Sequence, residues 1–178
     1  YTHIQYYLNN MCRIAAFPPN FSRDRAVFII RHFERKNTDG VGSVFVRNHQ
    51  FVVNKWPASL THILKREPSF LSHMPHNGWT LVHLRAASHG DNTMKNTHPF
   101  IAGKWAVIHN GIWSEYAVVK LALEPFVEIK GDTDSEVAAQ LINIAGPKKF
   151  AMTVDMGGVF MALNLNGNLH IAKTSGDL

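Results

Sequence analysis

The chain has 178 residues, of which 46% are hydrophobic and 17% charged, and its formal net charge is +5. This length and composition fit one globular domain and exclude a disordered, collagen-like or coiled-coil protein. No apolar run approaches the roughly 20 residues of a membrane span, the basic residues are too scattered for a nucleic-acid-binding protein, and the single cysteine fits a reducing, cytoplasmic compartment.

Residues 1–11 lack the features of a secretory signal, and we interpret them as a leader: a propeptide, a tag remnant or an added strand. The domain is expected over residues 12–178. Hydrophobic periodicity, β-branched residues and turn residues predict its elements. Up to residue 85 these are a strand at 12–17, a helix at 24–36, a hairpin of 41–47 with 51–55, a helix at 58–66, a loop at 68–78 and a strand at 80–85.

The second half of the chain predicts a strand at 104–109 and two helices with polar caps. Ser114 is the expected N-cap of a helix ending near residue 123, and Thr133 that of a helix at 134–144. Asn166-Gly167 joins strands 159–165 and 169–173 in a hairpin. Hairpins mixed with helices predict an α+β fold of antiparallel sheets covered by helices.

Four polar segments carry more chemistry than packing needs, and each has a simpler interpretation. Cys12 can be a small buried apolar residue, and Arg85 a solvated strand end. Residues 109–111 contain an Asn-Gly turn, and the acidic residues of 131–136 can stabilise a helix N-terminus. The eleven histidines match no metal-binding spacing. Asp132 and Asp134 resemble a Mg²⁺-binding D-x-D pair, but no nucleotide-site motif lies near them, so we predict no metal and no cofactor.

Taken together, the segments resemble the ordered motifs of the class II glutamine amidotransferases, which belong to the N-terminal nucleophile hydrolases. The motifs are Met11-Cys-Arg13, Arg85-x-x-Ser-His-Gly90, Asn96-Thr-His-Pro-Phe100, His109-Asn-Gly-Ile112 and Asp132-Thr-Asp-Ser-Glu136. The start at Met11 and the sequence Asn-Thr-Asp-Gly-Val-Gly at 37–42 look most like the small stand-alone branch. The resemblance implies a four-layer αββα sandwich of two antiparallel sheets covered by helices.

The resemblance also implies an activity: hydrolysis of the γ-amide of glutamine through a Cys12 thioester, with release of ammonia and glutamate. In this family the general base is the free α-amino group of the cysteine, whose ordinary pKa near 8 suits proton transfer. The Asn110 side chain and the Gly111 N–H are the implied donors to the oxyanion.

Four further residues match the substrate-binding positions of the family. Arg85 is implied to bind the α-carboxylate with two hydrogen bonds, and Asp134 the α-ammonium. Ser88 stands where the family commonly has threonine and shares the carboxylate, with His89 beside it. The implied substrate is glutamine or another γ-glutamyl compound, and a separate synthase is the implied acceptor of the ammonia; no nucleic acid and no membrane is expected as a partner.

Two departures from the family pattern qualify this interpretation. The peptide bond before Cys12 blocks its amine, so we expect activity only after removal of residues 1–11. Family domains usually continue for several strands past the region that matches 172–176, so we expect residues 12–178 to form either a C-terminally minimal domain or one whose outer sheet edge is incomplete. The alternative is a catalytically silent module of the same fold with a binding or structural assembly role.

Overall fold

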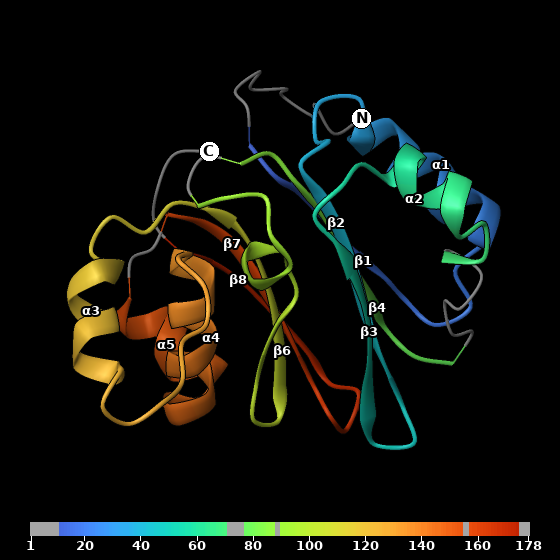
Figure 1. The fold of residues 1–178 in the computed structure, drawn as a ribbon. Helices are drawn as coiled ribbons and strands as arrows, with labels where there is room; N and C mark the ends of the chain where they lie inside the picture. The colour runs from blue at the N-terminus through green and yellow to red at the C-terminus, as the bar shows by residue number, and fades with distance from the viewer. Residues whose placement is uncertain (1–10, 71–76, 88–89, 155–156, 175–178) are drawn as a thin grey trace, which may run out of the picture.

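Two four-stranded antiparallel sheets lie face to face, and helices cover the outer face of each (Figure 1). The computed structural model describes residues 11–70, 77–87, 90–154 and 157–174. The four layers run from α1 (Arg23–Glu34) and α2 (Leu60–Arg66) through the two sheets to a second helix layer (Figure 1). That layer contains α3 (Tyr116–Leu123), α4 (Asp134–Ala145) and α5 (Pro147–Thr153). The predicted αββα sandwich is therefore confirmed.

The first sheet contains β1 (Arg13–Phe17), β4 (Thr80–Arg85), β2 (Gly40–Arg47) and β3 (Gln50–Trp56), in that order. All three pairings are antiparallel, and the predicted hairpin of residues 41–47 and 51–55 is confirmed as β2 and β3. The order places β4 in the centre, directly beside β1, so the end of β4 lies next to the residue that precedes β1.

The second sheet has the order β5 (Phe100–Ala102), β6 (Trp105–Gly111), β7 (Gly158–Asn164) and β8 (Leu169–Thr174). The β7–β8 hairpin confirms the Asn-Gly turn prediction. The short strand β5 was not predicted, because three residues are too few to show a periodicity.

Helices α1, α2 and α4 begin at side-chain caps. Ser22 accepts a hydrogen bond from the Arg25 N–H at the start of α1 (Arg23–Glu34), and Ser59 does the same for His62 in α2 (Leu60–Arg66). Thr133 caps α4 (Asp134–Ala145), as predicted. Two further helical segments, α5 (Pro147–Thr153) and the 3-10 turn η2 (Met94–Asn96), were not predicted.

The predicted cap at Ser114 is wrong. Helix α3 (Tyr116–Leu123) begins two residues later, after Glu115, and no side chain caps it. The Ser114 hydroxyl instead donates to the Glu115 carboxylate over 2.8 Å. The Ser114 oxygen accepts no hydrogen bond from the first turn of α3, so the backbone donors there go without a side-chain cap.

Strand alternation divides the interior into three apolar layers. In β4, Val82 and Leu84 pack against α1 and α2, whereas Leu81 faces the other sheet. In β6, Val107 packs against α4, and Ile108 faces the first sheet. Each sheet therefore contributes one face to a helix layer and one face to the layer between the sheets.

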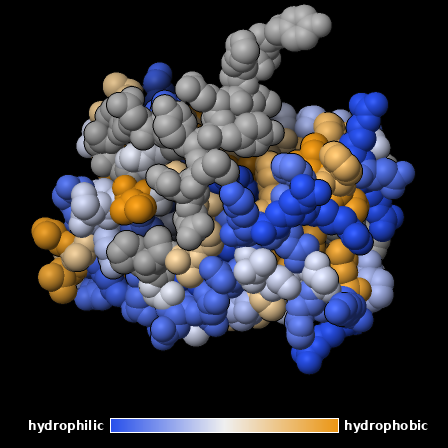
Figure 2. Space-filling view, turned by 90° about the horizontal axis from the view of Figure 1, so that it is seen from above, coloured by the Kyte–Doolittle hydropathy of each residue, from blue (hydrophilic) through white to orange (hydrophobic). Residues whose placement is uncertain are grey.

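The outer surface keeps some apolar side chains exposed. Seen from above, hydrophobic residues gather at the end of the molecule where α3 lies (Figure 2), and Val118 and Leu121 are 73% and 71% exposed there. The opposite side of α3 packs against the core through Tyr116 and Val119. None of the helices described here is long and apolar enough to cross a lipid bilayer.

Gly42 of β2 marks a close approach of two backbones. A Cβ atom at this position would overlap the His98 carbonyl oxygen and press on the Pro99 ring. The segment that leads into β5 therefore packs directly on β2, and only glycine leaves the space.

We expect Gly42→Ala to lower the free energy of unfolding by about 1–3 kcal/mol, because the added methyl group forces two backbones apart. The control is Gly78→Ala, since a Cβ there meets no atom within 4 Å; it should stay within about 0.5 kcal/mol of the wild type. Urea unfolding of the three proteins measures both values. Equal midpoints for Gly42→Ala and the wild type would show that the two segments are not in contact.

Candidate active site

The thiol of Cys12 lies at the start of β1, against the end of β4. Its Sγ donates to the Ala86 carbonyl oxygen over 3.5 Å and borders a cavity of about 40 Å³. Arg85, Gly111 and Asp134 line the same cavity. Four chain segments far apart in sequence therefore bring four of the predicted site residues together.

Arg85 ends β4 and is 4% exposed. Its Nη1 donates to the Asn92 side-chain oxygen over 2.6 Å and to the Asp91 carbonyl over 3.3 Å, and its Nη2 donates to the Gly90 carbonyl over 2.9 Å. Strand alternation explains its direction, because residues 81, 83 and 85 share the face of β4 that points to the second sheet. The alternative interpretation of Arg85 as a solvated strand end is therefore wrong, because its guanidinium is buried in the site.

Asp134 is the first residue of α4, where the helix dipole favours a negative charge. One carboxylate oxygen accepts from the Trp113 N–H over 2.9 Å, and the other from the Ser135 hydroxyl over 3.0 Å. The side chain is 19% exposed and faces the cavity that Cys12 borders. Its position is thus fixed by two donors, the backbone N–H of Trp113 and the hydroxyl of Ser135.

The two expected oxyanion donors end β6 and differ in their placement. Gly111 lines the cavity, whereas Asn110 does not. The Asn110 side-chain oxygen is buried and finds no hydrogen-bond partner among the residues described. Ser88 and His89, the other two predicted substrate contacts, lie outside the described residues.

Burial is the main influence on the Cys12 thiol and raises its pKa. The hydrogen bond to Ala86 and the positive charge of Arg85 lower this pKa, and the negative charge of Asp134 raises it. Since burial outweighs the cation, the surroundings keep the thiol protonated. Nucleophilic attack by this sulfur therefore needs a base.

His109 is a candidate base by position, but both of its ring nitrogens are engaged. Nε2 lies 3.3 Å from the Gly157 carbonyl, which only accepts, and Nδ1 lies 3.1 Å from the Ser135 hydroxyl. Burial lowers the pKa of His109, against the opposing effects of Asp134 and the Gly157 carbonyl. The ring supports Ser135 and Asp134 from behind and does not face the thiol as an acceptor.

A stacked pair of histidines, His83 and His98, adjoins the cavity, and His98 is one of its lining residues. The rings of His83 and His98 are 3.8 Å apart at an interplanar angle of 23°. Their nitrogens make no hydrogen bond of normal geometry with the described residues. Burial lowers the pKa of His83 to about 3, the charge of His109 adds to this, and the nearby His109 carbonyl opposes it. Both rings are therefore neutral in the folded protein.

Sequence analysis did not predict two residues, Asn37 and Asp39, that hydrogen-bond to the backbone beside Cys12 and Arg85. The Asn37 side chain donates to the Met11 carbonyl over 2.7 Å, and the Asp39 carboxylate accepts from the Ala87 N–H over 2.8 Å. Both belong to the sequence at 37–42 that resembles the family, but that resemblance did not indicate which groups they contact. Their contacts span 26 and 48 residues of sequence, and only the folded chain shows them.

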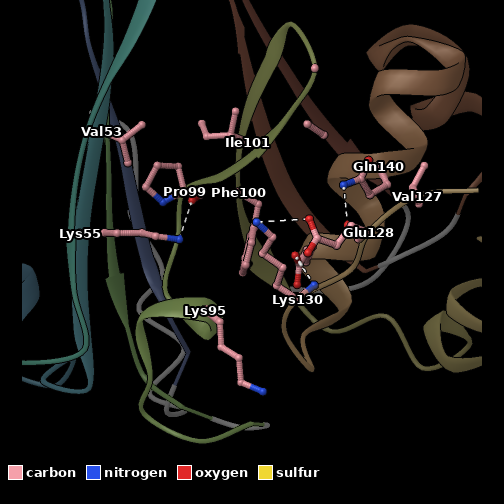
Figure 3. Close-up of a pocket in the computed structure, with 13 residues that line it drawn as sticks. Val53, Lys55, Lys95, Pro99, Phe100, Ile101, Val127, Glu128, Lys130 and Gln140 are labelled. Atoms are coloured by element: carbon pink, nitrogen blue, oxygen red, sulfur yellow. Dashed lines mark hydrogen bonds and ion pairs between the residues drawn. The ribbon is translucent and has the colours of Figure 1, made fainter. Parts of the chain in front are cut away.

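A larger cavity of about 540 Å³ lies on the other side of the segment that leads into β5 (Figure 3). Lys55 reaches into this region from β3 and donates to the Thr97 and Pro99 carbonyls over 2.9 and 3.4 Å. Glu136 accepts hydrogen bonds from two backbone N–H groups here, those of Lys130 and Gly131. Its lining holds lysines and carboxylates and no thiol, so the chemistry of amide cleavage selects the smaller cavity at Cys12.

Comparisons with known proteins identify the family of this chain and agree with its fold. A family model described as glutamine amidotransferases class-II matches residues 30–164. The chain is therefore a member of the class II glutamine amidotransferase family. Its expected likeness to the small stand-alone branch stays a prediction.

Two similar proteins are isomerizing glutamine–fructose-6-phosphate aminotransferases. That of Mycobacterium tuberculosis (strain ATCC 25618 / H37Rv) is 35% identical over 116 residues, which cover 64% of this chain and 19% of the relative. That of Sulfolobus acidocaldarius is 30% identical over 123 residues, which cover 67% of this chain and 20% of the relative. The chain thus spans about a fifth of the length of these relatives.

A similar solved structure is the glutamine phosphoribosylpyrophosphate amidotransferase from B. subtilis, complexed with ADP and GMP. It superimposes with a TM-score of 0.69 at 17% identity and covers 87% of this chain and 35% of that one. At this identity the match supports the fold alone.

We expect the buried histidine pair to make the fold sensitive to acid. The folded-state pKa of His83 is about 3 and the ordinary value is 6.5, so its contribution is complete above pH 6.5 and is lost as the pH falls toward 3. His83→Phe keeps an aromatic ring but cannot take up a proton. Its urea midpoint should therefore fall less between pH 7 and 5 than that of the wild type.

The control for this comparison is His32→Phe, because His32 lies exposed on α1. Its midpoint should fall with pH as the wild type does. If His83→Phe is as acid-sensitive as both, the buried pair does not control the acid response.

Proposed function

We propose that this chain hydrolyses the γ-amide of glutamine to glutamate and ammonia through a thioester on Cys12. One observation carries the proposal: a thiol, a buried guanidinium and a carboxylate, those of Cys12, Arg85 and Asp134, border one small cavity. A thiol supplies the nucleophile, and the two charges match the two ends of an amino acid.

The base in this proposal is the α-amino group of Cys12 itself. Burial favours the protonated thiol, and the nitrogens of His109 are engaged elsewhere. A free terminal amine has a pKa near neutrality and sits on the same residue as the sulfur. In this chain a peptide bond to Met11 occupies that nitrogen, so the active form begins at Cys12.

The reaction then has two steps. The amine takes the thiol proton as the sulfur attacks the amide carbon, and it returns the proton to the departing ammonia as the C–N bond breaks. Water then cleaves the thioester C–S bond, which yields glutamate and restores the thiol. In the tetrahedral states the Gly111 N–H and the Asn110 side-chain amide donate to the oxyanion.

Arg85 and Asp134 orient the substrate. The three oxygens that accept from Arg85 in residues 90–92 are uncharged, so a substrate carboxylate is a stronger partner for the guanidinium. Asp134 already accepts two neutral donors and binds the α-ammonium on its open side. The cavity holds little more than one water molecule, so glutamine binding requires its walls to move apart. Ser88 and His89 stay predicted contacts of the carboxylate.

The ammonia released in this proposal passes to a synthase that uses it. Residues 12–178 supply the amidotransferase domain. Arg85 and Asp134 form a clamp that recognises the α-carboxylate and α-amino groups, so other γ-glutamyl compounds also fit it. The groups beyond the γ-carbon do not enter the clamp.

We expect a chain that begins at Cys12 to release ammonia and glutamate from glutamine, and the chain with residues 1–11 attached to be inactive. Cys12→Ala in the short form should lower kcat by at least about 10³-fold, because no other thiol can replace it. Coupled assays of both products, together with the intact mass of each protein, measure the outcome.

Two results would contradict this account in different ways. Full activity with residues 1–11 attached would show that the free amine is not needed. No activity in either form would favour the non-catalytic module with a binding or assembly role.

We expect Arg85→Lys to raise KM for glutamine by roughly 10- to 100-fold, because a lysine makes one charged bond where the guanidinium makes two. The α-amide of glutamine lacks the carboxylate, so the variant and the wild type should use it equally poorly. Arg31→Lys, on the exposed surface of α1, should match the wild type. Equal losses for glutamine and its α-amide would mean that Arg85 only supports the fold.

A further inference from the structure

Asn37 is a buried amide with a single visible task. It follows α1, is 1% exposed, and its backbone N–H donates to the Glu34 carbonyl over 3.1 Å. Its side-chain Nδ2 donates to the Met11 carbonyl oxygen over 2.7 Å. The amide is therefore held in place from its own backbone and aimed at the peptide that precedes Cys12.

Arg13 fixes the same stretch from the other side. Its Nη1 donates to the Met11 carbonyl over 3.1 Å and to the Cys12 carbonyl over 3.2 Å. The Cys12 sulfur is meanwhile bound to Ala86. The Cys12 nitrogen thus lies between anchored groups, only about 2.3 Å from the Met11 oxygen by standard peptide geometry.

Removal of the residues before Cys12 replaces the hydrogen-bond acceptor that Asn37 contacts with a group that donates. The Met11 carbonyl oxygen is an acceptor, whereas the new α-amine presents N–H donors and one lone pair. A carboxamide carries a donor and an acceptor on one carbon, and a half-turn of its plane exchanges them with almost no change of shape. Asparagine can therefore bind the chain in both forms, whereas aspartate can only accept and alanine can do neither.

We propose that Asn37 is the positioning residue of the Cys12 α-amine: its amide donates to the Met11 carbonyl while that residue is attached, and its Oδ1 accepts from the amine once Cys12 is the first residue. The proposal rests on the function proposed above. An acceptor on one amine hydrogen fixes rotation about the Cα–N bond and so aims the lone pair at the thiol proton and the leaving group.

The first test compares stability in the two forms and needs no activity. In the form with residues 1–11, Asn37→Asp places a carboxylate against the Met11 carbonyl oxygen and should lower the urea midpoint. In the form that begins at Cys12 the same carboxylate meets an ammonium, so the loss should be clearly smaller. Asn54→Asp, the matched change on β3, should shift the midpoint equally in both forms.

The second test uses kinetics in the form that begins at Cys12. Asn37→Ala should lower kcat roughly 10- to 100-fold with KM within about threefold, because the amine is present but not aimed. Asn37→Asp should move the acid limb of the kcat–pH profile to higher pH, since a carboxylate stabilises the ammonium. A merely structural residue would not move that limb.

The outcomes separate this proposal from the one on which it rests. An inactive wild-type chain beginning at Cys12 would overturn the proposed function, and the stability comparison would still decide the role of Asn37. Equal stability losses of Asn37→Asp in the two forms, or an unchanged pH profile in an active variant, would overturn the assignment of Asn37.

Discussion

The apolar layer between the two sheets is the constraint on which the candidate site depends. Leu81 and Ile108 meet there with no exposure to solvent. On β4, His83 and Arg85 lie on the same face as Leu81, two and four residues further along the strand. On β6, Asn110 lies on the same face as Ile108, two residues further along. The layer therefore changes from apolar to polar toward one end, and that end borders the thiol.

The same packing explains why the site is electrostatically balanced. Arg85 and Asp134 act on the pKa of the Cys12 thiol in opposite directions, and burial decides the result. A site built this way holds a zwitterion well and does not ionise its own nucleophile. The need for a base thus follows from the burial that the fold imposes. In the proposed function the α-amine of Cys12 supplies that base once the peptide bond to Met11 is cleaved.

Sequence patterns predicted the long strands and the helices α1, α2 and α4, because their periodicity and caps are local. They did not predict β5 or α5, which are too short to show a period. They also misplaced the start of α3, where Glu115 and not Ser114 is the N-cap residue and no side chain caps the helix. Among site residues, Cys12, Arg85, Gly111 and Asp134 were predicted from ordered motifs, and the structure shows that they share one cavity. Asn37 and the His83–His98 stack depend on contacts between distant segments, which no local pattern encodes.

Covalent labelling tests the central claim most directly, since the chain has one cysteine. A glutamine-analogue electrophile, mixed with the chain that begins at Cys12, should add its mass once, to the peptide that contains this residue. Excess glutamine should slow the reaction, because both molecules need the same clamp. Labelling that is absent, or that glutamine does not slow, would contradict the claim that this thiol faces a pocket for an amino acid.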